Sequence, residues 1–137
     1  MLILLASLAA AGSAQSPKWN GTWSATAGSR VFSGTWEAAE SSDAATASGH
    51  WTLTDRSGTP LAAGTWAAGK SAKVWQGSWQ ARAVNGQTYS GTWRAQVQLA
   101  ATAPMAEMFQ AALASAIQGT WHMGSPAGAW SIRAYSR

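Results

Sequence analysis

Cysteine is absent from the chain, which excludes a disulfide framework, a thiolate metal site and a lipid-modified cysteine. Charge is scarce as well, because only 10% of the 137 residues are Asp, Glu, Lys or Arg. The nine basic residues outnumber the five acidic ones, but they are spread singly with no basic run. Nucleic-acid binding needs a clustered basic footprint, so we expect no nucleic-acid partner.

Long apolar runs are also missing. The most apolar stretch, residues 2–11, is well short of the roughly 20 residues that a membrane-spanning helix needs. Gly12, Ser13 and Ala14 follow it, as in a secretory signal peptide, although the usual basic start is lacking. We therefore predict a signal peptide over residues 1–14 and a single domain over residues 15–137, long enough for one core. We expect the cleaved protein to be exported, periplasmic or extracellular, without membrane insertion.

What the sequence has instead is tryptophan, ten residues in all, and eight of them follow a glycine by two positions. The copies of this G-x-W motif are NGTW (20–23), SGTW (33–36), SGHW (48–51), AGTW (63–66), QGSW (76–79), SGTW (90–93), QGTW (118–121) and AGAW (127–130). The first six copies are 13 to 15 residues apart, which suits one strand and a short turn. Around the sixth copy apolar and polar side chains alternate, as is typical of a half-buried strand.

Turn-forming residues separate the copies, and Asn85-Gly86 is a favoured two-residue hairpin turn. Loops this short force neighbouring strands to run antiparallel. The predicted strands cover residues 18–27, 31–39, 46–54, 60–68, 73–83, 88–99, 117–123 and 128–135. The predicted fold is therefore all-β, an eight-stranded antiparallel up-and-down barrel whose closure removes exposed sheet edges. An open meander and a two-sheet sandwich are the alternatives.

The motif itself suggests how such strands pack. The glycine and the tryptophan of one copy lie on the same face of a strand, because side chains alternate. If neighbouring strands are registered on the middle residue of the motif, each tryptophan faces a glycine, and its indole covers the bare backbone. We therefore interpret the repeat as core architecture, with the indoles inside the barrel.

One segment breaks the repeat and predicts a helix. Between the sixth and seventh motifs, apolar residues fall at helical spacing, with Pro104 suited to the first turn. The apolar stripe comprises Met105, Met108, Phe109, Ala112, Leu113 and Ala116. We predict a short amphipathic helix near residues 104–115, between strands six and seven, that closes one end of the barrel with this stripe.

The Gly-Thr-Trp strand openings resemble those of avidin-type biotin-binding barrels, which also repeat a glycine and an aromatic residue along up-and-down strands. The resemblance implies the same barrel architecture. Those barrels place polar groups inward shortly after the aromatic residue, whereas this chain has Ala25 and Ala38 there. The resemblance therefore does not extend to biotin binding.

Groups that could carry catalysis are few. His50 and His122 fall on the outward face of strands three and seven, which a barrel does not bring together, so we expect no metal site. The acidic residues fall outward, in turns or on the helix, and do not form a carboxylate pair. The sequence also lacks a nucleophile elbow and a phosphate loop. We predict a non-catalytic protein without a cofactor.

Two functions fit such a barrel. The first is a binding or interaction module of the cell envelope or exterior, whose partner is an extracellular protein. The alternative is a carrier of a small apolar or aromatic ligand in an internal cavity lined by indoles. The ligand-binding residues would then be Trp36, Trp51, Trp66, Trp79 and Trp93. A further alternative is an outer-membrane barrel, but such barrels place their aromatic residues at the interfaces rather than in the middle of each strand.

Overall fold

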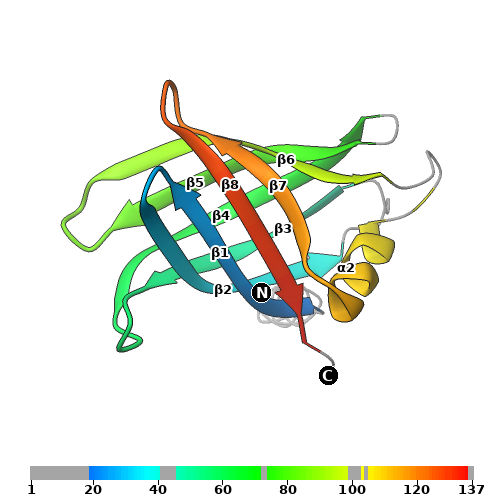
Figure 1. The fold of residues 1–137 in the computed structure, drawn as a ribbon, viewed down its shortest axis with the longest axis horizontal. Coiled ribbons are helices and arrows are strands. Elements are labelled where there is room, and N and C mark those ends of the chain that lie inside the picture. Colours follow the sequence, from blue (N-terminus) through cyan, green and yellow to red (C-terminus); the bar gives the residue numbers. More distant parts are fainter. Residues whose placement is uncertain (1–18, 41–45, 72–73, 99–102, 104, 136–137) are drawn as a thin grey trace, which may run out of the picture.

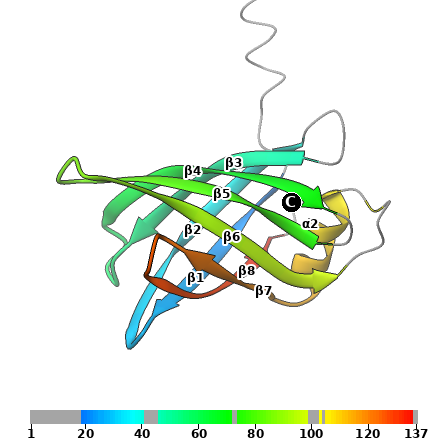
Figure 2. The same cartoon turned by 90° about the horizontal axis from the view of Figure 1, so that it is seen from above.

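The computed structural model describes residues 19–40, 46–71, 74–98, 103 and 105–135. Its elements are β1 (Trp19–Ala27), β2 (Arg30–Glu40), β3 (Thr46–Thr54), β4 (Pro60–Ser71), β5 (Val74–Ala83), β6 (Thr88–Gln98), α2 (Met105–Ala114), β7 (Ile117–His122) and β8 (Ala127–Ala134). Consecutive strands pair antiparallel and β8 returns to β1, so the sheet is a closed barrel (Figures 1 and 2). The predicted barrel and the helix between the sixth and seventh strands are confirmed. The predicted signal peptide lies outside the described residues.

The register of the barrel alternates from one strand pair to the next. Within the hairpins β1–β2, β3–β4, β5–β6 and β7–β8 each motif tryptophan faces a motif glycine, as predicted; Trp23, for example, pairs with Gly34. Between hairpins the prediction is wrong, because Trp36 faces Trp51, and the β4–β5 and β6–β7 pairs repeat this arrangement. A closed barrel needs stagger between its strands, and identical registration throughout would give none. The offsets are even-numbered, so every indole stays on the inner face.

The indoles form two tiers. The upper tier, from the odd-numbered strands, consists of Trp23, Trp51, Trp79 and Trp121; the lower tier, from the even-numbered strands, consists of Trp36, Trp66, Trp93 and Trp130. In each hairpin the upper-tier residue lies closer to the hairpin turn. Neighbouring upper-tier rings meet edge to face, with centroids 5.6 to 6.4 Å apart. Such contacts contribute about 0.5–1.5 kcal/mol each beyond burial.

Each of the eight indole N–H groups donates a hydrogen bond to a backbone carbonyl of another strand. Trp23 Nε1, which lies over Gly34, donates to the carbonyls of Thr35 and Thr52, both at 3.1 Å. A Cβ built on Gly34 would overlap the Thr52 carbonyl oxygen and lie 3.0 Å from this nitrogen. The glycine is therefore needed for close approach of the strands as well as for the indole.

The end of the barrel opposite the β3–β4 and β5–β6 turns is closed by α2 (Figure 1). The inward residues there are small, so the helix has room to pack: the buried alanines are Ala38, Ala47, Ala68, Ala95 and Ala134. Phe109 enters this space, is 1% exposed and stacks on Trp36 with ring centroids 5.4 Å apart. The Lys70 ammonium, 5.7 Å from the centroid of the Trp75 ring, donates to the Ala103 carbonyl just before the helix.

The buried stripe of α2 is narrower than predicted. Met108, Phe109 and Ala112 are buried, as expected, but Leu113 is 36% exposed and Ala116 is exposed. The side chain of Met105 lies outside the described set. The helix packs on the barrel end with one side only, so Leu113, which follows Ala112 in the helix, points towards solvent. None of the described helices is long and apolar enough to cross a membrane.

Candidate binding cavity

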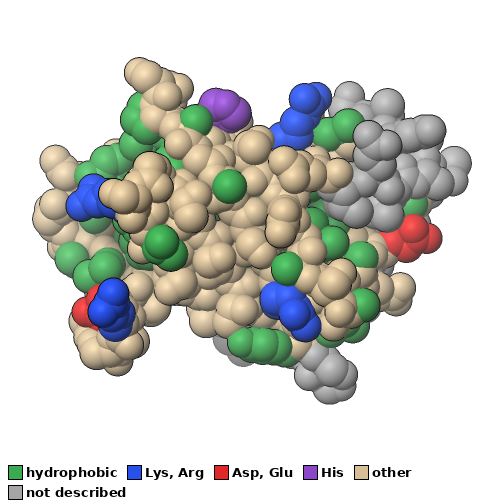
Figure 3. Space-filling view, viewed as in Figure 1, with side chains coloured by type: hydrophobic (Ala, Val, Ile, Leu, Met, Phe, Trp, Pro, Cys, Tyr) green, Lys and Arg blue, Asp and Glu red, His purple; other side chains and the backbone are tan. Residues whose placement is uncertain are grey.

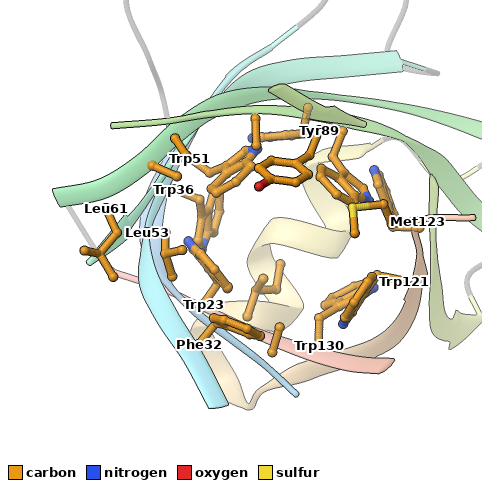
Figure 4. Close-up of a pocket in the computed structure, with 18 of the residues that line it drawn as sticks. Trp23, Phe32, Trp36, Trp51, Leu53, Leu61, Tyr89, Trp121, Met123 and Trp130 are labelled. Atoms are coloured by element: carbon orange, nitrogen blue, oxygen red, sulfur yellow. The ribbon is translucent and has the colours of Figure 1, made fainter. Parts of the chain in front are cut away.

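The barrel has a hollow interior, which the indoles of both tiers surround. A cavity of about 610 Å³ extends from α2 to the open end of the barrel. Figure 4 shows aromatic rings surrounding this space, with the helix visible behind it. Its floor is formed by Met108, Phe109, Trp36 and Trp66. The interior of an eight-stranded barrel can be filled by side chains or leave room for one small ligand. In this barrel the side chains leave room.

All five tryptophans predicted to bind a ligand line this cavity. Trp36 and Trp66 lie deep, against Phe109, whereas the other three lie in the wall. Three further indoles of the same motif, Trp23, Trp121 and Trp130, also line it and were not selected. The sequence placed all eight motif indoles inside the barrel, and the structure shows that all eight line the same cavity. The binding role of these residues stays a prediction.

The wall is chemically uniform. Because the indole N–H groups are bonded to backbone carbonyls, the rings present carbon atoms to the cavity. Ala62 and Ala81 lie between them and are also apolar. A ligand group that needs a hydrogen bond therefore finds no free indole donor along this wall. The cavity favours an apolar or aromatic body, held by dispersion and by removal of its surface from water.

The open end of the cavity differs from this apolar wall, because the cationic side chain of Arg30 lines it. Arg30 is the first residue of β2 and shares the inward row with Phe32, Gly34 and Trp36. It lines the cavity together with Leu61 of β4, two strands away in the barrel. Arg30 was not among the predicted site residues because the second strand was predicted to start at residue 31. Its alternation with Phe32 is the signal that places it inward.

The rest of the rim is apolar. Leu61 is 40% exposed and Tyr89 is 41% exposed, and both line the cavity. The Tyr89 hydroxyl donates to Gln87 Oε1 at 2.8 Å, so the ring is held at the edge of β6. Figure 4 places Phe32, Leu53 and Met123 around the same opening.

Titratable groups elsewhere do not form a site among the described residues. His50 lies 3.8 Å from Glu37 on the neighbouring strand, and both side chains are exposed. His122 is on β7, which does not pair with β3. The described part of the chain contains no cluster of three His, Cys, Asp or Glu residues suited to a metal. On the face shown in Figure 3, Lys and Arg side chains lie singly rather than in a patch.

Among the carboxyl groups that the structure describes, that of Asp55 has a clear local role. The Ser57 hydroxyl donates to it at 2.7 Å and, with the Thr59 backbone N–H, holds the pKa of this carboxyl below its ordinary value. These bonds close the turn between β3 and β4. The carboxylate stabilises a turn and does not line the cavity.

A second hollow, of about 580 Å³, lies over the outer surface of β2 to β5. Polar side chains such as Ser48, Thr65 and Gln80 surround it. Its lining is more polar than that of the interior cavity, whereas small-molecule sites are lined predominantly by apolar side chains. The interior cavity is the better candidate.

No protein-family model, no curated protein and no solved structure matches this chain significantly. The resemblance of its strand openings to avidin-type barrels therefore rests on the strand pattern alone.

Proposed function

We propose that this protein is a non-catalytic binding protein that holds a small apolar or aromatic molecule inside the barrel. The observation that carries the proposal is the cavity of about 610 Å³, which both indole tiers surround and which is open at the hairpin end. Its volume is within the range of about 300–1,000 Å³ typical of ligand pockets. Apolar surface buried there contributes roughly 25 cal/mol per Å². An exported carrier or scavenger of such a molecule fits the predicted signal peptide.

The cavity favours one of the two functions that the sequence left open. If the indoles served only to build a core, close packing would be expected to fill the interior, because protein cores contain few voids larger than water. A large apolar space costs stability unless something occupies it. This supports the carrier over a barrel that acts only through its outer surface.

Binding to an extracellular protein is the second candidate, and one observation favours it. Val31 and Val84 are 72% and 77% exposed, close to the open end. Affinity capture from an envelope extract tests it, with the Val31→Ser/Val84→Ser double variant as the control. A partner that the wild type retains and the double variant releases supports this function, and equal capture by both contradicts it.

Membrane insertion of the barrel is the least supported alternative. The outward face of β5 and β6 carries exposed side chains such as Gln80, Arg82 and Arg94. An outer-membrane barrel needs an apolar band on that face, and a basic residue at the bilayer midplane costs about 2–4 kcal/mol.

Ligand binding can be tested with N-phenyl-1-naphthylamine, a neutral apolar fluorophore, excited through the tryptophans. We expect a saturable energy transfer with a single class of site. Ala81 lines the cavity and is 8% exposed, so Ala81→Phe extends a ring into it and should weaken binding at least tenfold. Ala63 is exposed on the outer face of the neighbouring strand, so Ala63→Phe is the matched control and should bind normally. Absence of saturable transfer in the wild type, or equal binding by both variants, would contradict the proposal.

A further inference from the structure

We infer that the natural ligand is an amphiphile with a carboxylate head, held by Arg30 at the open end while its apolar tail occupies the indole-lined cavity. This inference rests on the proposed function and names the chemical class of the ligand. It follows from where the interior offers polar partners and where it does not.

The depth of the cavity has no place for a charged or hydrogen-bonding group. The indole nitrogens of both tiers are already bonded to backbone carbonyls, including Trp36 to Thr22 and Trp130 to Thr120. A polar group buried there would lose its bonds to water without replacement, at a cost of several kcal/mol. Any polar end of the ligand must therefore remain at the mouth.

At the mouth, Arg30 supplies a matching partner. It is the one charged residue among those that line the cavity, and its place in the inward row of β2 directs it to the opening. A guanidinium stays charged at all physiological pH values, and its planar fork suits the two oxygens of a carboxylate.

No carboxylate of the described residues neutralises Arg30 by an ion pair. Asp55, in the turn that joins β3 to β4, accepts hydrogen bonds from Ser57 and Thr59 instead. Glu37 lies beside His50 on the outer face, and Glu107 is on α2 at the closed end. The guanidinium is thus left for an external anion.

The surroundings of Arg30 fit the other half of an amphiphile. Phe32 and Leu53 lie just inside the opening, and Leu61 and Tyr89 lie at its edge. These side chains form an apolar path from the mouth to Phe109 at the floor. A carboxylate at Arg30 and a hydrocarbon chain along this path would satisfy both regions of the cavity at once.

The test displaces bound N-phenyl-1-naphthylamine with dodecanoate and, separately, with dodecan-1-ol, each below its aggregation concentration. The two competitors have the same chain length and differ in the charge of the head. Arg30→Gln should weaken dodecanoate binding about fivefold, the effect of one partly exposed ion pair. It should leave the affinity for dodecan-1-ol unchanged. Arg82→Gln, an exposed outward arginine near the same end, is the matched control and should change neither.

The outcomes separate the two proposals. If both competitors displace the probe and Arg30→Gln affects neither, or weakens both equally, the head-group assignment is wrong while the proposed function stands. If the probe binds to the wild type but dodecanoate never displaces it, the assignment is likewise overturned. If the probe itself does not bind the wild type, the proposed function is contradicted, and the head-group assignment that rests on it is contradicted as well. Unchanged probe affinity in Arg30→Gln shows that the variant is folded.

Discussion

The pairing of an indole with a bare glycine can be tested by adding a single methyl group to Gly34. In Gly34→Ala the new Cβ would overlap the Thr52 carbonyl oxygen and crowd Trp23 Nε1. The strands β2 and β3 would have to separate, because the obstacle is backbone rather than the end of a flexible side chain. The substitution should therefore be strongly destabilising, although alanine is normally better than glycine in a strand.

The size of the effect follows from these contacts. Overpacking that shifts the backbone costs about 1–3 kcal/mol. The two hydrogen bonds from Trp23 to the carbonyls of Thr35 and Thr52 are worth about 1 kcal/mol each and would be strained or lost. Alanine recovers about 0.5–1 kcal/mol of chain entropy. We expect Gly34→Ala to lower the free energy of unfolding by about 3 kcal/mol.

The matched control is Gly69→Ala, also within a strand. No atom lies within 4 Å of the position of its Cβ, so this variant should be neutral or slightly stabilising. Equilibrium unfolding in urea, followed by tryptophan fluorescence, gives both free energies. Exchange of the Trp23 indole proton, measured by NMR, should be faster in Gly34→Ala only. If the two variants differ by less than about 0.5 kcal/mol, steric need for glycine under the indole is refuted.

Three further predictions concern the helix and the turns. Phe109→Ala should lower the free energy of unfolding by about 3 kcal/mol, because the Phe109 ring is 1% exposed and contacts three indoles. Leu113→Ala should lower it by less than about 1 kcal/mol. Equal losses of stability in thermal unfolding would contradict the buried stripe. Asp55→Ala should destabilise more at neutral pH than near pH 2: the pKa of Asp55 is lowered in the folded state, so its contribution is present above the unfolded pKa and disappears as pH falls through the folded value. A pH-independent difference would refute this. Gly86→Ala should cost about 1 kcal/mol because φ is 90° in this turn, and an unchanged urea midpoint would argue against it.

The strands and the helix could be predicted because their signals are local. Alternation around Trp93 assigns an inward and an outward face, and the Asn85-Gly86 turn fixes a hairpin. The predicted bounds differ from the observed ones by a few residues at the ends, where local preference is weak. Even so, one such end residue, Arg30, proved to be the charged group of the cavity.

Whether the interior is filled or hollow could not be predicted, because the volume of the cavity depends on distances between residues far apart in the chain. The alternating register, with Trp36 opposite Trp51 but Trp23 opposite Gly34, sets the stagger and separates the tiers. How far Phe109 enters then decides where the hollow ends. Neither quantity is encoded in the spacing of a single motif.

By itself, the order of residues determined that this chain forms antiparallel strands with glycine and tryptophan on one face, since a period of two depends only on neighbouring residues. Tertiary structure alone decided that the indoles surround an open space with Arg30 at its mouth. The physical reason is that closure couples all eight strand pairs, so the interior is a property of the whole ring and not of any one strand.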